Sequence, residues 1–153
     1  MKNKIHTIEV ENNETQSVEK IIEKIKENKI IYVKNKFYED EDVLDSISEN
    51  GPAIILNSSG SSGKPRKCFH HLDNLKLSAI TSGQWLIEQG FELQNCLILN
   101  TLPLNHISGL MPIFRSQSWG CNYVNISPSL IKNTREILLF TIKSKKNLSL
   151  IHI

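Results

Sequence analysis

The stretch from Ile55 to Lys67 carries the residues of this chain that are best suited to binding chemistry. It reads ILNSSGSSGKPRK and contains four serines, two glycines and three cationic side chains. Glycines let the backbone take positive φ angles and approach a ligand closely, and successive N–H groups in such a turn can bind an anion. Serine hydroxyls add donors, while Lys64, Arg66 and Lys67 add positive charge. We therefore expect this stretch to hold a polyphosphate.

Two other interpretations of the stretch have to be weighed. The P-loop of many nucleotide-binding proteins needs a lysine that opens a helix, whereas Lys64 is followed by Pro65, which excludes a helix start with free amides at that point. A flexible Gly/Ser linker is the composition-based alternative. Apolar runs flank both ends of the stretch, and its cations gather at one end. Both observations favour a binding loop over a linker.

The segment from Ser58 to Arg66 resembles the phosphate-binding signature of the adenylate-forming superfamily, which includes acyl-CoA synthetases, luciferases and peptide-synthetase adenylation domains. That pattern has small hydroxyl or glycine residues, a glycine, two hydroxyls, a glycine, any residue, a proline and a Lys or Arg. The resemblance implies that the loop binds the phosphates of ATP, and the cofactor-binding residues would be Ser58, Ser59, Gly60, Ser61, Ser62, Gly63, Lys64 and Arg66. Arg66 stands where the family usually has lysine, so a planar fork replaces a point charge.

A second motif, Leu102-Pro-Leu-Asn-His-Ile-Ser-Gly-Leu110, follows a buried apolar run and precedes a predicted helix. Ligands of open α/β sheets bind at such strand ends. The segment resembles the Leu-Pro-Leu-(aromatic)-His-x-x-Gly-Leu segment of the same superfamily, and its distance from the first motif agrees. The resemblance implies that His106 borders the acyl-substrate pocket as the candidate catalytic residue. Asn105 replaces the usual aromatic residue, and a purely structural histidine is the alternative for His106.

His70 and His71 fall where the superfamily has a Thr/Ser-His pair, just before a helix whose start often carries Asn-Leu, here Asn74 and Leu75. We expect these histidines to act on the site indirectly, through its neighbours. A loop histidine with only a structural role is an equal alternative.

The resemblance implies a two-step reaction. A small-molecule carboxylic acid attacks ATP to give an acyl-adenylate and pyrophosphate, and coenzyme A then displaces AMP. The cofactors would be ATP, Mg²⁺ bound through ATP, and coenzyme A as co-substrate. The sequence has no Tyr-Gly-x-Thr-Glu segment for adenine, no Thr-Gly-Asp segment for ribose and no lid with a catalytic lysine. The expectation is a truncated α/β fold, part of the large N-terminal domain with a mixed sheet flanked by helices.

Residues 1–50 would be a short lead-in segment, and residues 51–153 a partial AMP-binding domain. The compact lead-in resembles that of small aryl-CoA ligases. An alternative is a catalytically inactive nucleotide-binding remnant, and a further alternative is an interaction protein whose Gly/Ser stretch is a linker. Because partners of the buried strand at 97–102 would be missing, we expect the chain alone to be marginally stable or to self-associate.

Charge is distributed unevenly along the chain. Residues 1–50 carry twelve acidic residues against eight lysines, and residues 51–153 carry ten cationic residues against four acidic ones. The basic part contains the predicted phosphate loop, which suits an anionic ligand. No basic stripe with interleaved aromatics points to nucleic acid. No membrane span or signal peptide is visible, and the odd, widely spaced cysteines suggest buried thiols in a cytoplasmic protein rather than a metal site.

The hydrophobic pattern predicts alternating strands and helices. Strands are expected at 5–10 (at a sheet edge), 30–33, 53–57, 67–70, 96–102, 121–126 and 148–153. Helices are expected at 18–28, 37–50, 72–89, 109–119 and 129–143. Ser17 is the predicted N-cap of the first helix, and Asp73 or Asn74 that of the third. Gly90 should end the third helix, with Leu75, Leu77, Ile80, Trp85 and Leu86 facing the core. The alternation argues for an α/β architecture.

Overall fold

A computed structural model describes residues 4–11, 15–37, 51–58, 66–126 and 149–151. Its first sheet has four strands in the order β1 (Ile5–Val10), β2 (Ile30–Asn35), β3 (Ala53–Asn57) and β4 (Lys67–His71). The first three strands run parallel, and β4 returns antiparallel to β3. β1 lies at the edge of this sheet, as its sequence predicts.

The second sheet is built around β5 (Cys96–Asn100), whose five residues are all buried. β5 lies between β6 (Asn122–Asn125) and β7 (Ser149–Ile151), and it is parallel to both. An unbroken apolar run is typical of a strand covered on both faces. The prediction of a buried strand from residue 96 is therefore confirmed, but the strand ends at Asn100 and not at Leu102. It also has a partner on each side, so the expectation that its partners are missing is wrong.

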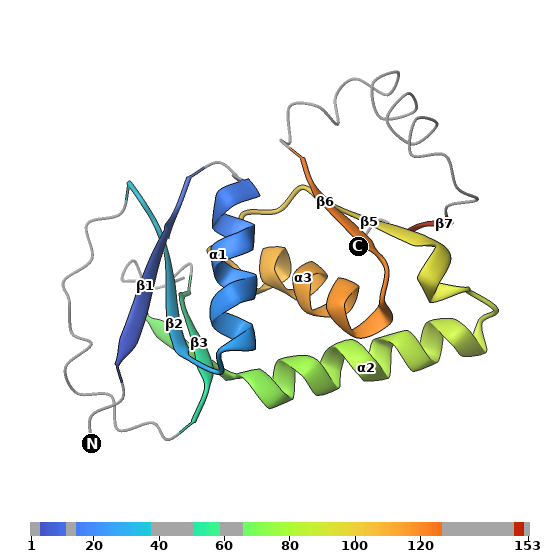
Figure 1. Cartoon of the computed structure of the whole chain (residues 1–153), viewed down its shortest axis with the longest axis horizontal. Coiled ribbons are helices and arrows are strands. Elements are labelled where there is room, and N and C mark those ends of the chain that lie inside the picture. The colour runs from blue at the N-terminus through green and yellow to red at the C-terminus, as the bar shows by residue number, and fades with distance from the viewer. Residues whose placement is uncertain (1–3, 12–14, 38–50, 59–65, 127–148, 152–153) are drawn as a thin grey trace.

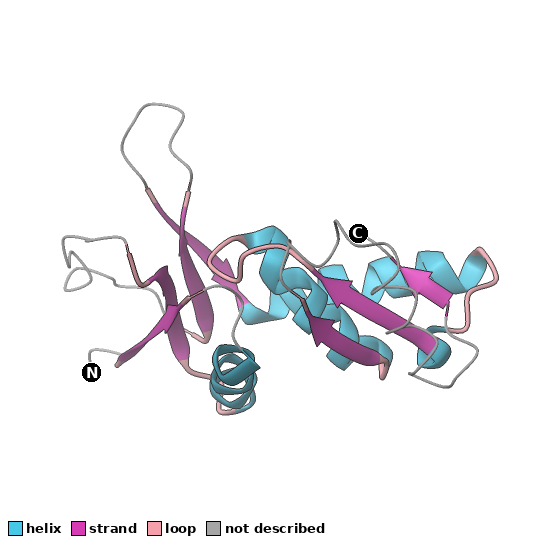
Figure 2. Cartoon of the chain, turned by 90° about the horizontal axis from the view of Figure 1, so that it is seen from above, coloured by secondary structure: helices cyan, strands magenta, loops and turns pink. Residues whose placement is uncertain are grey.

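Helices connect and cover the two sheets. α1 (Thr15–Lys26) packs on the first sheet, whereas α2 (Leu72–Glu88) runs from the first sheet toward the second, with α3 (Ile107–Trp119) packed against it (Figure 1). The view from above shows the first sheet at one end of the chain and the second sheet at the other, where it lies over helices (Figure 2). The result is a mixed α/β fold. A short 3₁₀ turn at Leu93–Asn95 leads into β5.

One large hydrophobic cluster joins the elements of both sequence motifs. It contains Ile21 of α1, Ile54 and Leu56 of β3, Leu72 of α2, and Phe114 of α3, together with other buried apolar residues. A smaller cluster around Cys96, Ile98 and Trp119 lies under the second sheet. Residues from positions 8 to 114 therefore share one core, so the first strands and α1 pack with the elements that follow position 51.

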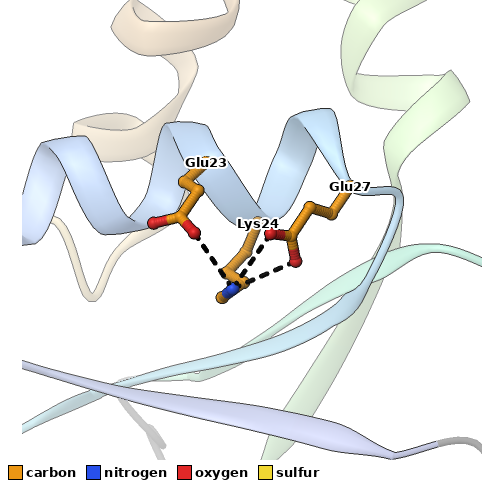
Figure 3. Close-up of polar contacts among 3 residues, drawn as sticks. All are labelled: Glu23, Lys24 and Glu27. Carbon is orange, nitrogen blue, oxygen red and sulfur yellow. Dashed lines mark hydrogen bonds and ion pairs between the residues drawn. The ribbon is translucent and has the colours of Figure 1, made fainter.

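The outer face of α1 is charged, as its sequence predicts. The Lys24 ammonium lies 3.3 Å from a carboxylate oxygen of Glu23 and 3.0 Å from one of Glu27 (Figure 3). The inner face buries Val18, Ile21 and Ile25. This separation of charged and apolar faces is typical of a helix at the surface.

Several predicted details of the helices are wrong. Ser17 lies buried inside α1 and is not its N-cap. α2 begins directly after β4, with His71 at the N-cap and no side-chain cap bond, so Asp73 and Asn74 do not cap it. The N–H of Leu72 instead donates to the Pro52 carbonyl at 3.0 Å. Because β4 and α2 join without a loop, the N-cap position of α2 is occupied by His71, the last residue of β4.

The outer face of α2 also differs from the prediction. Leu75 is buried, but Leu77, Ile80 and Trp85 are 62%, 47% and 59% exposed. The prediction placed Leu77, Ile80 and Trp85 in the core together with Leu75, because apolar residues occur on several sides of this helix. Gly90 does follow the helix end, with a φ of +88° that favours glycine.

The remaining predictions concern two helices outside the described residues, the cysteines, and the absence of a membrane span. The predicted helices at 37–50 and 129–143 fall almost entirely in the undescribed ranges 38–50 and 127–148. The cysteines of the described part are free thiols, with Cys96 buried and Cys68 and Cys121 half-buried. No helix among the described residues is long and apolar enough to cross a membrane.

Candidate functional site

The predicted phosphate loop connects two paired strands, β3 and β4. Asn57 is the register partner of Lys67, so these residues close the hairpin. Just beyond them, the Ser58 N–H donates to the Arg66 carbonyl at 2.7 Å, and the Arg66 N–H donates to Ser58 Oγ at 3.0 Å. These two bonds hold the ends of the loop together. The predicted residues Ser59, Gly60, Ser61, Ser62, Gly63 and Lys64 lie outside the described residues.

A buried tyrosine lies beneath the base of this hairpin. Tyr32 of β2 has no exposed surface. Its hydroxyl lies 3.0 Å from Asn57 Nδ2 and 3.2 Å from Asn57 Oδ1. The Lys67 ammonium lies 5.3 Å from the centroid of the Tyr32 ring, which is the range of a cation–π contact. Tyr32 therefore fixes both strands at the point where they enter the loop.

His70 and His71 lie at the other end of β4. They pair with Ile54 and Ala53 at the beginning of β3, away from the Ser58–Arg66 closure. Burial lowers the pKa of His70, which favours its neutral form. The backbone of His71 leads directly into α2. The described contacts thus give these histidines a place in the strand-to-helix junction.

The second motif begins where β5 ends, and the buried amide of Asn100 organises it. Asn100 Nδ2 lies 3.0 Å from the Gly109 carbonyl, 3.3 Å from the Leu102 carbonyl and 3.0 Å from both the Tyr123 hydroxyl and Asn125 Oδ1. Its Oδ1 accepts the Leu102 N–H at 3.1 Å. One side chain therefore connects the end of β5, the start of α3 and the end of β6.

His106 is the N-cap residue of α3. Its carbonyl accepts the N–H groups of Gly109 and Leu110 at 3.0 and 3.1 Å, and its own N–H donates to the Pro103 carbonyl at 3.2 Å. The side chain is half-buried. A Cβ atom on Gly109 would lie 2.0 Å from the Pro103 carbonyl oxygen. Only glycine fits there, which explains why the motif places it three residues after the histidine.

The two motifs lie on different sheets but share one core. Leu104 and Leu110 of the histidine segment belong to the same buried cluster as Leu56 of β3 and Leu72 of α2. The core therefore fixes the base of the predicted phosphate loop and the His106 turn relative to each other.

Sequence reasoning missed the residues that support the two motifs. They are Tyr32, Asn100 and Tyr123, together with Lys67, whose ammonium contacts the Tyr32 ring. The detectable signal was Asn100, a polar residue at the end of an otherwise apolar strand. Burial raises the pKa of Tyr123 to about 12, partly offset by its hydrogen bond with Asn100. Among the residues that the structure describes, no group of three His, Cys, Asp or Glu side chains could hold a metal ion.

Comparison with known proteins gives matches among solved structures. No family model and no curated protein matches the sequence. The structure is similar to o-succinylbenzoate CoA synthetase (MenE) from Bacillus subtilis in complex with AMP, with a TM-score of 0.54, 18% identity, and 93% of this chain covered. The same enzyme bound to the acyl-adenylate OSB-AMP matches with a TM-score of 0.53, 16% identity and 100% of this chain covered. The chain has the fold of part of an adenylate-forming enzyme.

The match covers only a part of each solved structure. The chain spans 37% of the AMP complex and 57% of the OSB-AMP complex. A third structure of the enzyme, with ATP and a magnesium ion, matches with a TM-score of 0.52 and 18% identity, over 94% of this chain and 49% of that one. The predicted fold class, a mixed sheet with helices that corresponds to part of such a domain, is confirmed.

Proposed function

We propose that this chain is part of an AMP-forming carboxylic acid–CoA ligase. In this proposal the loop from Ser58 to Arg66 binds the phosphates of ATP, and His106 borders the pocket for the acyl substrate. The acid attacks the α-phosphate to form an acyl-adenylate with loss of pyrophosphate, and the thiol of coenzyme A then displaces AMP.

One observation carries the proposal. The nine-residue segment that resembles the phosphate signature falls on the β3–β4 connection of a fold similar to MenE, an enzyme solved with ATP and magnesium. A Gly/Ser linker would have no reason to start and end in paired strands. Here its two ends are closed by hydrogen bonds of 2.7 and 3.0 Å. The phosphate loop therefore fits the geometry better than the linker does.

The chemistry of the loop suits the first step. Negative charge accumulates on the leaving pyrophosphate, and backbone amides, hydroxyls and cations placed around it stabilise that charge. Arg66 and Lys67 bring two cations to the end of the loop where it re-enters β4. Mg²⁺ would enter bound to the phosphates of ATP, where it neutralises charge further.

The finer proposal concerns the substrate. Three of the solved structures that this chain resembles are structures of o-succinylbenzoate CoA synthetase. We infer that an aromatic or other small carboxylic acid, with o-succinylbenzoate as the first to test, is the substrate of the complete enzyme. Asn105, half-buried beside His106, would then present an amide where the superfamily usually presents an aromatic ring.

Acid-dependent exchange of labelled pyrophosphate into ATP tests the proposal. Exchange should require Mg²⁺, ATP and the correct acid, and it should be lost in Gly63→Val combined with Arg66→Ala. Lys20→Glu on the exposed face of α1 is the matched control and should leave exchange unchanged. ATP binding that is unaffected by the double substitution would show that the loop is not the phosphate site.

A catalytically inactive nucleotide-binding remnant is the second candidate. The two candidates separate in the same assay, because a remnant binds Mg-ATP without any acid-dependent exchange. Limited proteolysis separates both from a linker: a phosphate loop should gain protection near Ser61 when Mg-ATP is added, whereas a linker is cut equally with and without it.

A further inference from the structure

Two free cysteines lie at the start of the β5–β6 pair, Cys96 as the first residue of β5 and Cys121 as the residue just before β6. Leu97 is the register partner of Asn122 in these parallel strands, so one step back on each strand places Cys96 opposite Cys121. Neighbouring strands lie about 4.8 Å apart. That spacing falls within the Cα–Cα range of about 4.4–6.8 Å that a disulfide bridges. The backbone therefore places the two thiols where a bond between them requires little movement.

The two thiols also point to the same face of the sheet. Side chains two residues apart in a strand share a face, and Cys96 and Cys121 precede the register partners Ile98 and Tyr123 by two residues each. All four side chains belong to one hydrophobic cluster, with Trp119 beside them. The Cys121 N–H donates to the Ser116 carbonyl at 3.2 Å, which fixes its backbone just before β6.

Access from solvent differs between the two. Cys121 is half-buried, whereas Cys96 has no exposed surface and its thiol lies 3.4 Å from the Glu92 carbonyl. We propose that Cys96 and Cys121 form a redox-active pair that closes into a disulfide, with Cys121 as the entry thiol and Cys96 as the resolving thiol. This pair is independent of the proposed ligase activity.

The oxidant would be a low-molecular-weight disulfide such as oxidised glutathione. The Cys121 thiolate attacks one sulfur of that disulfide, forms a mixed disulfide and releases one glutathione thiolate, which takes up a proton. The Cys96 thiol loses its proton to solvent, and the resulting thiolate attacks the Cys121 sulfur and releases the second glutathione thiolate, which takes up a proton. Two protein thiols are oxidised by two electrons, and one oxidised glutathione is reduced to two glutathione molecules.

The bond would close the segment 97–120, which contains the His106 turn and α3. Burial, aided by the neighbouring Cys96, raises the pKa of Cys121 to about 11, so its thiolate is scarce at neutral pH. Closure should therefore be slow at neutral pH and accelerate as the pH rises toward that value.

The test exposes the native, reduced full chain to oxidised glutathione and follows its intact mass and its peptide map. The expected product has lost the mass of two hydrogen atoms and yields a Cys96–Cys121 cross-linked peptide. Cys68→Ser should form the same product, because Cys68 lies on the other sheet. Cys96→Ser should instead accumulate a glutathione adduct at Cys121, because no resolving thiol is available.

Three outcomes would overturn the proposal. One is a Cys121–glutathione adduct that persists in the unsubstituted chain as it does in Cys96→Ser. Another is a cross-link that involves Cys68, and the last is a native chain in which neither Cys96 nor Cys121 reacts. A reduced chain unfolded in urea is the control, and it should give a mixture of all pairings.

Discussion

Asn100 shows how a single buried amide holds a turn together. Its Nδ2 has two hydrogens but lies within 3.0–3.3 Å of four oxygens, so these acceptors share the two donors. The oxygens come from the loop after β5, from α3 and from β6. No apolar residue of the same size could replace these bonds, although the surrounding strand is apolar.

Replacing Asn100 by leucine should destabilise the fold by about 1–3 kcal/mol, because buried polar groups such as the Gly109 carbonyl lose the amide that bonds to them. Urea unfolding measures this change. Asn95→Ala is the matched control, since Asn95 is exposed and its bond to Glu92 lies on the surface. Equal stability of the two variants would contradict the role assigned to Asn100.

Tyr123 gives a pH-dependent prediction. Burial raises its pKa to about 12, whereas an unfolded tyrosine has a pKa of about 10. The folded state therefore holds the phenolic proton more tightly, and this contribution to stability is complete below pH 10 and is lost between about 10 and 12. Urea unfolding at several alkaline pH values should show a steeper loss of stability for the unsubstituted chain than for Tyr123→Phe. Parallel curves would mean that another group causes the loss.

The two sequence motifs could be read because they combine glycine, proline and polar residues at fixed spacing. The buried residues that support these motifs could not be identified from the sequence, because Tyr32 is separated from Asn57 by twenty-five positions. Tyr123 is likewise separated from Asn100 by twenty-three. Only the pairing of strands brings these residues together, and a single sequence does not show which strands pair.

At the scale of elements, α1 and α2 differ in how well their sequences predict their surroundings. α1 has a charged face and an apolar face, and its buried apolar residues are those that the hydrophobic pattern of the sequence predicts. In α2 no charged residue occurs between Lys76 and Glu88, so the pattern could not tell the buried face of Leu75 and Ala79 from the exposed one. A helix that is apolar all round is usually buried on all sides.

We propose that the exposed apolar face of α2 contributes to the expected self-association, so that Leu77→Glu combined with Trp85→Glu, which places charges on this face, should reduce it. The free energy of unfolding should change little, by roughly 0.5 kcal/mol or less per exposed site. Sedimentation velocity at several concentrations measures the first effect and urea unfolding the second. Lys20→Glu on α1 is the control, and an unchanged sedimentation coefficient in the double variant would show that this face takes no part in association.

At the scale of the whole molecule, the contact of α2 with α3 connects the two sheets. The indole N–H of Trp119 donates to the Ala79 carbonyl at 2.7 Å. A Cβ atom on Gly83 would lie 2.5 Å from the Trp119 ring nitrogen, so α2 approaches closely where glycine leaves space. Because α2 starts at the first sheet and α3 packs beside the second, this contact couples the two halves.

Trp119→Phe should lower the free energy of unfolding by about 1 kcal/mol, since it removes the buried indole bond to the Ala79 carbonyl, which keeps its bond from the Ser82 hydroxyl. Urea unfolding followed separately by circular dichroism and by tryptophan fluorescence should still coincide, because the core is shared. Trp85→Phe removes the other tryptophan, which is 59% exposed, and should leave stability nearly unchanged. Two separate transitions in the unsubstituted chain would show that the halves unfold independently.

The strand pairings also set an order in which the chain can acquire its structure during synthesis. All four strands of the first sheet have left the ribosome once His71 has emerged, and each pairs with a neighbour in sequence. β5 has to wait, because its partner β7 is made more than fifty residues later, with Ser149 opposite Cys96. Distant pairings of this kind form slowly. One edge of β5 therefore stays open until β7 has been made.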